Sequence, residues 1–564
     1  MNAINWRRVI QIGLIMGVVV LTASMIGMVQ TFDERDLIEN LLTLGQVLLF
    51  APALYAGYLA AGKAEGQSLA RLLAGVLAGG LAAVPPILLI WLTTVWTTIR
   101  DYFVNVSPQL IEILTFGRGP GVGSLLLLAV MAGMGLLGAA IHLIPQRTRR
   151  PLVNASLFTF AFALFSDVPL NIANQFLERN TVRLFFPTKG ITLLAAVIVF
   201  VLALGFALWW EFRGRAQRQQ RLATMTPEVR RRNSFILMAV AAVLLLVLPR
   251  ILGIFLINVV DQVGTFVLMA LGLNIVVGFA GLLDLGYVAF FAVGAYVTAL
   301  LTSTSDLGLG MNFWIAMPIG VTAAVLFGVF LGIPVLRLRG DYLAIVTLGF
   351  GEIIRVLVRS DLLKPVIGGA QGILEVGRPA IGSFEFVTPQ HYYYLILAGC
   401  IVALYIAWRL RDGRAGRQWM AMREDEDVAE AVGIHLVGTK LLAFAIGAGF
   451  AGLAGAIFGS RVGSVFPNSF ELLISINVLA IIIVGGVGSL PGVILGAFVL
   501  VGLPELLREF VEFRLLIYGI LLIVMMLVKP EGLWPSAVRR RELHADAETA
   551  AHEGIQHEEV QPLM

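Results

Sequence analysis

Long apolar stretches, separated by short polar connections, run through almost the whole chain. A transmembrane helix needs about 20 mostly apolar residues, and such stretches predict about six spans in the N-terminal part and about ten in the C-terminal part. The N-terminal candidates are Val9–Val29, Asn40–Gly62, Leu69–Val95, Val122–Ile144, Leu152–Phe176 and Ile191–Trp210. The C-terminal candidates are Phe235–Phe255, Val259–Val277, Leu285–Leu301, Phe313–Leu336, Tyr342–Val358, Tyr392–Trp408, Thr439–Gly459, Leu472–Val487, Val493–Leu507 and Leu515–Val528. The pattern predicts an all-α polytopic integral membrane protein with about 16 transmembrane helices.

Leu152–Phe176 is the weakest candidate, because Asp167, Asn171 and Asn174 interrupt it. The distribution of positive charge nevertheless favours it, since cytoplasmic loops carry an excess of Lys and Arg. The basic clusters are Arg7/Arg8, Lys63 with Arg71, Arg147/Arg149/Arg150, Arg213 to Arg232, Arg337/Arg339, Arg409 to Arg423, and Arg539 to Arg541. If all of them are cytoplasmic, an even number of spans must separate neighbouring clusters, and this requires Leu152–Phe176 to cross. Both termini are then expected in the cytoplasm, and a re-entrant pair would leave this sidedness unchanged.

The composition supports a lipid environment. Hydrophobic residues make up 58% of the 564 residues and charged residues 13%, whereas a soluble domain carries about 25% charged residues. Sixty glycines interleaved with apolar residues are typical of closely packed transmembrane helices. Polar segments divide the chain into an N-terminal multi-span region of unknown role (1–210), a basic cytoplasmic linker (211–233), a second membrane domain (234–536) and a polar cytoplasmic tail (537–564) expected to be disordered.

Enzymatic chemistry has no support in the sequence. One segment, Gly57 to Ala64, resembles a phosphate-binding loop, but alanine stands where Ser or Thr would bind Mg²⁺, and the segment ends an apolar helix. The single cysteine, Cys400, excludes an internal disulfide and a cysteine-based metal site. We therefore predict a chain that is not an enzyme, with no cofactor, no metal and no nucleotide site, so any ATP energy must come from a partner chain.

The most informative polar segment, Arg409–Lys440, lies between two predicted spans. Four acids, Glu424 to Asp427, favour the start of a short helix, because the helix dipole stabilises negative charge there. An apolar face follows at helical spacing, formed by Val428, Ala431 and Val432. Gly433 is suited to end the helix. Two interpretations remain open: a solvated loop, or a short amphipathic helix that docks a cytoplasmic motor.

Several segments, in the same order, resemble the M-type permease of branched-chain amino acid importers. Ala429-Glu-Ala-Val-Gly433 resembles the short coupling segment of ABC importer permeases. The other matching segments are Leu273–Tyr296, Arg339–Arg355, Gly368–Ile373 and Val484–Gly492. The resemblance extends from Ser234 to Ser536 and leaves the preceding region unmatched. Ala370 and Gln371 stand where the family pattern has Pro and Asn.

The resemblance implies an ABC importer permease in a bacterial cytoplasmic (inner) membrane. The implied partners are a second, similar permease subunit, two cytoplasmic ABC ATPase subunits and an extracytoplasmic substrate-binding protein, for which we expect the external loop Ser360–Gln390 to provide a contact. The implied substrates are branched-chain amino acids or related small solutes. Urea or short amides remain an alternative, since a sister family transports them on the same scaffold. The ATPase-coupling residues implied are Arg423, Glu424, Asp425, Ala429, Glu430, Ala431 and Gly433.

Polar residues and glycines within or beside the predicted spans are candidates for the translocation path or for a structural role. They are Asp284, Tyr287, Asp341, Tyr342, Glu352, Arg355, Gly369, Asn477, Gly485 and Gly486. Asp284 and Asp341 lie near predicted helix ends, where they can be solvated or cap a helix. Glu352 and Arg355 are one turn apart and can pair with each other. The run Gly485–Gly492 is expected to break a helix, and glycines at 447, 449, 452, 455 and 459 form a stripe for close packing.

Two other classes of membrane protein compete with this interpretation. An ion-coupled secondary transporter needs no ATPase and depends on membrane carboxylates, of which the sequence offers few deep ones, mainly Asp167 and Glu352. A membrane scaffold without transport would leave the coupling segment unexplained.

Overall fold

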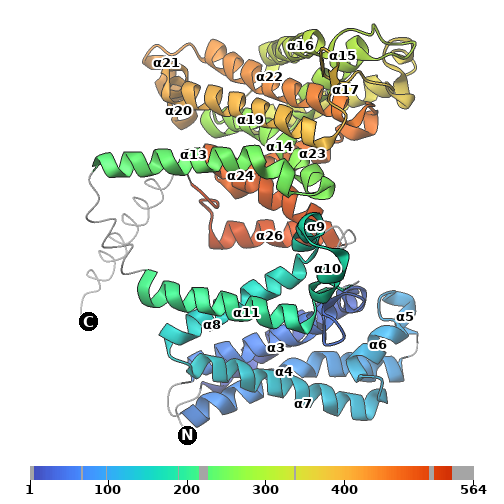
Figure 1. Cartoon of the computed structure of the whole chain (residues 1–564), viewed down its shortest axis with the longest axis vertical. Helices are drawn as coiled ribbons and strands as arrows, with labels where there is room; N and C mark the ends of the chain where they lie inside the picture. The colour runs from blue at the N-terminus through green and yellow to red at the C-terminus, as the bar shows by residue number, and fades with distance from the viewer. Residues whose placement is uncertain are drawn as a thin grey trace, which may run out of the picture. The chain divides into compact units, whose positions relative to one another are not determined.

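The structure is a computed structural model of the chain, which describes residues 5–64, 68–96, 98–187, 190–214, 227–335, 338, 340–506 and 513–535. The tail predicted for 537–564 and residues 215–226 of the predicted linker lie outside the described residues. The chain divides into two compact units, Met1–Ala242 and Val243–Met564. Their helices are drawn in Figure 1.

Unit 1 is helical apart from one small hairpin. Its longer helices are α1 (Trp6–Met25), α3 (Leu44–Lys63), α4 (Ser68–Val95), α7 (Gly119–Leu143), α8 (Gln146–Leu164), α9 (Asp167–Phe176) and α11 (Leu193–Trp209). Shorter elements connect them: α2 (Met28–Asp33), α5 (Ile99–Tyr102), α6 (Pro108–Thr115), α10 (Arg179–Phe185) and the π-helical turn η1 (Trp210–Gly214). Strands β1 (Asp36–Ile38) and β2 (Leu42–Thr43) pair antiparallel before α3.

Small residues allow α3, α4 and α7 to pack closely. A side chain at Gly57 of α3 would overlap the backbone of Gly135 in α7, and one at Gly135 would overlap Gly75 in α4. The segment that resembles a phosphate-binding loop forms the last turns of α3, which end at Lys63, as predicted.

The doubtful span Leu152–Phe176 is a bent pair of helices. α8 ends at Leu164 and α9 begins at Asp167, with a bend of 70° between them. Within α9, the Asn171 side chain donates to the carbonyl of Asp167 at 2.7 Å, which satisfies a polar group inside an otherwise apolar stretch. The polar residues noticed in the sequence therefore mark the bend and the start of α9.

Unit 2 is likewise helical, and α13 (Pro227–Ile251) runs across the division between the units. The elements that follow are α14 (Ile254–Leu273), η2 (Asn274–Phe279), α15 (Val288–Thr302), α16 (Phe313–Val335), α17 (Asp341–Arg359), α18 (Lys364–Ile367), η3 (Gly369–Gln371), α19 (Pro389–Asp412), α20 (Arg414–Glu424), α21 (Glu426–Ala431), α22 (Leu436–Val462), η4 (Pro467–Phe470), α23 (Leu472–Gly485), α24 (Leu490–Ala497), η5 (Phe498–Gly502), α25 (Leu503–Leu506) and α26 (Arg514–Val528). Of these, η2 and η5 are π-helical segments that continue α14 and α24.

The long helix α22 lies in the core of unit 2, against α14, α15 and α16. Its glycine stripe is the reason. A side chain at Gly455 would overlap the carbonyl of Phe291 in α15, and one at Gly452 would lie 2.5 Å from the Ala324 side chain of α16. The predicted stripe therefore packs helices together, as small residues do in membrane proteins.

The connection between α17 and α19 contains the predicted external loop. It holds α18, η3 and a hairpin of two short strands, β3 (Ala380–Ile381) and β4 (Phe384–Glu385), none of which the sequence predicted. Ile373 pairs with Val465 beyond the end of α22 through two backbone hydrogen bonds of 2.9 and 2.8 Å. The loop is thus fastened to the core and exposes apolar side chains, among them Ile381 and Phe384.

The chain is an all-α polytopic membrane protein. Among the described residues, ten helices are long and apolar enough to cross a membrane, or eleven when the bent pair α8–α9 counts as one span. The other expected spans fall on α13, α15, α17, α24 to α25, and α26, whose apolar parts are shorter or carry more charge. The total of about 16 spans therefore stays a prediction.

Candidate functional site

The predicted coupling segment forms two helices rather than one. Glu424 is the last residue of α20, and α21 begins at Glu426, so the expectation that Glu424 opens the short helix is wrong. Asp425 between them is extended, and its carboxylate accepts hydrogen bonds from the backbone nitrogens of Asp427 and Val428, both at 2.9 Å. This N-cap restarts the helix after a sharp turn.

α21 presents an apolar face to its surroundings. Val428 is 60% exposed and Val432, directly after the helix, is 72% exposed. Glu430 and Ala431 are also exposed, whereas Ala429 is buried against unit 2. Gly433 follows with φ of +89° and donates to the carbonyl of Glu430, which ends the helix as predicted. Such a face suits a protein partner.

Two contacts with α22 hold the segment α20–α21 in place. The Lys440 ammonium lies 2.6 Å from the Glu426 carboxylate, and the lysine side chain is 4% exposed. The indole nitrogen of the fully buried Trp419 donates to the carbonyl of Thr439 at 2.8 Å. The sequence analysis missed both contacts, although a lysine inside the first turns of an apolar helix is a signal that it has an acidic partner. In Figure 1, α20 and α21 lie together beside one end of α22.

Arg423 connects this segment to the end of η2. Its guanidinium donates to the carbonyl of Gly278 at 2.8 Å. The carbonyls at the end of a helix lack partners within the helix, and a cation is well suited to satisfy them. The same side chain lies over Gly281, where a Cβ atom would come within 2.7 Å of it. Arg423 and the segment Leu273–Tyr296, which the sequence analysis noted separately, are therefore in contact.

The glycine run after α23 breaks the helix, as expected. Gly486 and Gly488 have φ of +118° and +79°, which only glycine adopts readily, and α24 begins at Leu490. The backbone nitrogen of Trp534 donates to the carbonyl of Gly485 at 2.9 Å, and this hydrogen bond holds the segment after α26 against the break. We call residues 486–489 the second helix break, and η2 with residues 280–287 the first.

Asp284 and Tyr287 lie in the first helix break and have structural contacts. Asp284 is fully buried, which excludes the first of its two expected roles, a solvated carboxylate, and leaves capping open; its Oδ1 accepts from the nitrogen of Gly286 at 2.9 Å. The hydroxyl of the buried Tyr287 donates to the carbonyl of Gly447 in α22 at 2.8 Å. The backbone nitrogen of the next residue, Val288, donates to Ser475 Oγ of α23 at 2.9 Å. The break is thereby tied to two core helices.

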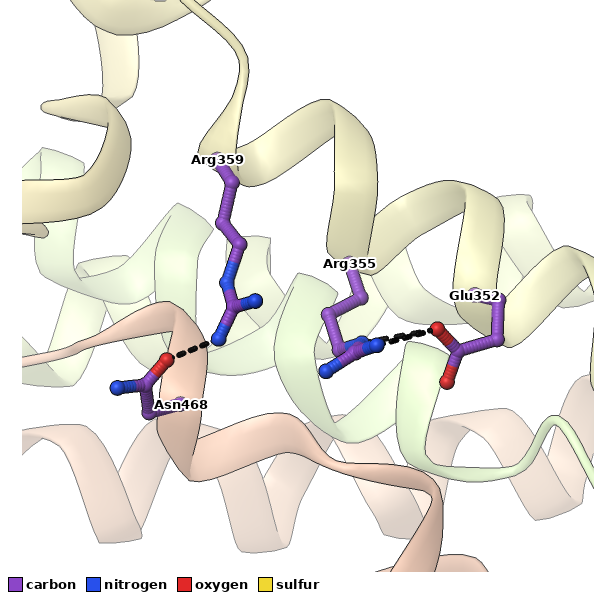
Figure 2. Close-up of polar contacts among 4 residues, drawn as sticks. All are labelled: Glu352, Arg355, Arg359 and Asn468. Atoms are coloured by element: carbon purple, nitrogen blue, oxygen red, sulfur yellow. Dashed lines mark hydrogen bonds and ion pairs between the residues drawn. The ribbon is translucent and has the colours of Figure 1, made fainter.

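Glu352 and Arg355 form the ion pair that the sequence predicted, with 2.7 Å between nitrogen and oxygen. Their side chains are 34% and 28% exposed in this chain. Figure 2 shows the two pointing toward each other along α17, while Arg359 one turn further reaches Asn468 of η4. The cavity beside Arg355, between α15, α17 and η4, has a volume of about 10 Å³. It holds one water molecule at most, so no amino acid fits there in this conformation.

The structure does not bring the remaining candidates together. Asp341 is the first residue of α17, and its side chain is outside the described part; Tyr342 beside it is 73% exposed. Gly369 is buried with φ of +56° in the connection after α18. Asn477 is half-buried on α23. Over the residues that the structure describes, no group of three His, Cys, Asp or Glu side chains could hold a metal ion.

Residues 255–528 match the model of a protein family described as branched-chain amino acid transport system / permease component. Over 293 residues, which are 48% of this chain and 68% of the relative, the chain is 41% identical to the high-affinity branched-chain amino acid transport system permease protein LivM of Escherichia coli strain K12. It is 25% identical to the corresponding LivH protein of Salmonella typhimurium over 297 residues, or 49% of this chain and 93% of the relative. No solved structure shows a significant match to the chain.

Proposed function

Because the chain belongs to the family of branched-chain amino acid transport permeases, we propose that it is the membrane permease subunit of an ABC importer that moves branched-chain amino acids or related small solutes into the cell. The observation that supports this most directly is α21. A short helix with an exposed apolar face, held to the core by the buried contacts of Lys440 and Trp419, can transmit a displacement imposed by a partner protein. A flexible loop cannot transmit it.

The partners follow from this proposal. The importer would contain two cytoplasmic ABC ATPases, and this chain would contact an ATPase through its one coupling helix, α21, with Glu430 and Gly433 at the interface. A second, similar permease would complete the pathway, and an extracytoplasmic binding protein would dock on the connection between α17 and α19, where Ile381 and Phe384 are exposed. The chain itself supplies no nucleotide site in this arrangement, and the relatives named LivM and LivH support a pairing of two permeases.

We also propose the topology that the basic clusters indicate. The chain would cross a bacterial inner membrane about 16 times with both termini in the cytoplasm. Residues 234–536 would form the permease domain, and residues 1–210 an additional membrane domain joined to it by the basic linker 211–233. The family match, which begins at residue 255, leaves the role of that additional domain unassigned.

Charge reversal in α21 tests the coupling role. The substitution Glu430→Lys should abolish or strongly reduce ATP-dependent uptake in membranes that contain the partner subunits, because it places a cation on the docking surface. Arg417→Glu, an equal charge reversal on the exposed side of α20, serves as the control and should retain uptake. Wild-type uptake by Glu430→Lys with the ATPases still associated would refute the coupling role of α21.

Competition uptake decides the substrate class. We expect labelled leucine to be taken up, unlabelled isoleucine and valine to compete with it, and labelled urea not to be taken up. Uptake of labelled urea or short amides without uptake of labelled leucine would replace the proposed substrate with that class. Uptake that collapses under a proton uncoupler while ATP is held constant would favour an ion-coupled transporter over an ABC importer.

A further inference from the structure

The two helix breaks of unit 2 are in direct contact. The side-chain oxygen of Asn274, in η2, accepts from the backbone nitrogen of Gly488 at 2.9 Å, and Asn274 is fully buried. A Cβ atom at Gly278 would lie 2.8 Å from the same nitrogen. The first break can therefore move relative to the second only if this contact changes.

Arg423 is the side chain that reaches this junction from the coupling segment. It lies two residues before Asp425, the N-cap of α21, and donates to Gly278 at the end of η2. A Cβ atom at Gly488 would lie 4.0 Å from its Nη1 atom, so the guanidinium is near the second break as well. The Arg423 guanidinium thus connects the segment before α21 to both helix breaks, which are separated by more than 200 residues in the sequence.

Two other contacts of the coupling segment, those of Lys440 and Trp419, are made with a different element. Lys440 and Trp419 connect α20 and α21 to α22, a continuous helix of 27 residues. A continuous helix moves as a rigid body, whereas π-helical segments and glycine turns can adopt alternative hydrogen-bond patterns. Arg423 is therefore a contact through which a displacement of α21 can reach backbone that can rearrange.

Resting on the function proposed above, we propose that Arg423 is a positioning residue that transmits the displacement of α21 to the two helix breaks, through the Gly278 carbonyl and the Asn274–Gly488 hydrogen bond. Its loss leaves the ATPase docking surface intact but separates ATP hydrolysis from the rearrangement that opens the pathway. This predicts a specific defect: ATP is hydrolysed, and solute import per ATP falls.

The test uses the complete importer, reconstituted in proteoliposomes, with leucine uptake and ATP hydrolysis measured on the same sample. Loss of a hydrogen bond from a charged group predicts that Arg423→Ala lowers uptake per ATP at least about tenfold. Arg423→Lys keeps the charge and one donor, and should recover most of the ratio. Arg417→Ala removes an arginine from the exposed side of the same helix and should leave the ratio unchanged.

A second variant shows whether the effect follows the proposed route. Asn274→Ala removes the acceptor for Gly488 and should also lower uptake per ATP. If both residues serve one route, the double variant Arg423→Ala/Asn274→Ala is no worse than the more impaired single variant, because effects within one network are not additive. Two independent structural defects would instead multiply.

Amide hydrogen exchange provides a readout that does not depend on transport. In the wild-type complex, addition of a non-hydrolysable ATP analogue should change exchange in residues 425–434, 274–281 and 485–489. In Arg423→Ala, the change should remain in 425–434 and disappear from the two breaks, while exchange without nucleotide shows that the variant is folded.

Three results for Arg423→Ala would overturn the proposal. They are a wild-type ratio of solute uptake to ATP hydrolysed, loss of the ATPases from the complex, or a nucleotide-dependent change in hydrogen exchange at both breaks that equals that of the wild type. If the wild-type complex hydrolyses ATP without importing solute, the proposed function itself is wrong, and the role of Arg423 falls with it.

Discussion

The ion pair between Lys440 and Glu426 allows a quantitative prediction about α21. Lys440→Met replaces the ammonium with an apolar group of similar length and leaves the Glu426 carboxylate, 23% exposed, without its buried cation. Because α21 has only six residues, it cannot be stable on its own. Its order must depend on contacts with the core, and this ion pair is one of them.

The magnitude follows from the geometry. At 2.6 Å and an effective dielectric constant of about 20, the attraction between the two charges is about 6 kcal/mol. The loss of hydration of both groups offsets part of this, and removing one partner of a buried pair typically costs about 3–5 kcal/mol. Since Glu426 keeps some contact with solvent, we expect a cost of about 3 kcal/mol for Lys440→Met.

Amide hydrogen exchange of the full-length chain in nanodiscs measures this cost. A decrease of about 3 kcal/mol in the free energy of local opening predicts exchange about 150-fold faster for the amides of Ala429, Val432 and Ile434, or exchange at the rate of an unstructured peptide. These amides donate hydrogen bonds within and just after α21. Lys364→Met, on the separate helix α18, should leave their exchange unchanged.

The double variant Glu426→Gln/Lys440→Met decides whether charge is the cause. Removing both charges should restore a large part of the protection, because it also removes the carboxylate charge that Lys440 balanced. A change of less than about fivefold in Lys440→Met, or a double variant as unprotected as the single one, would refute the reasoning.

Three further predictions concern unit 2, and thermal unfolding in detergent measures the change in stability for each. Gly455→Val should destabilise the protein by about 3 kcal/mol, because the side chain would overlap a carbonyl of α15; a wild-type unfolding temperature would show that α15 and α22 are not so close. Ser475→Ala should cost about 1–3 kcal/mol, since it leaves the buried nitrogen of Val288 without an acceptor, while Ser475→Thr should be milder. Glu352→Gln should change the free energy of unfolding by at most about 1 kcal/mol, because the ion pair with Arg355 is partly exposed. If Glu352 lines the pathway, the same variant lowers uptake; unchanged uptake would assign Glu352 a structural role.

Structural features that depend only on residues close together in the sequence, such as spans and contacts within one helix, could be predicted from the sequence alone. Each predicted span falls on a helix or a bent pair of helices, because a backbone in lipid must satisfy its hydrogen bonds within the segment. The pair Glu352–Arg355 and the end of α21 at Gly433 also follow from local geometry, since the spacing along a helix sets the distance between side chains. The start of α21 was missed because Asp425 can continue a helix or cap one, and the charge pattern is the same in both cases.

The arrangement of the candidate site was decided by tertiary packing. Arg423 and Gly278 are 145 residues apart, and Gly488 and Asn274 are 214 apart. Nothing in either segment indicates its partner, because residues so far apart in the sequence meet only through the packing of the helices that carry them. The sequence therefore determined that this chain is a polytopic membrane protein with a polar segment between two spans, and it left open whether that segment is a loop or a short helix. Only tertiary packing, which the glycines of α22 permit, brought Arg423 at the end of α20 to the two breaks in the core.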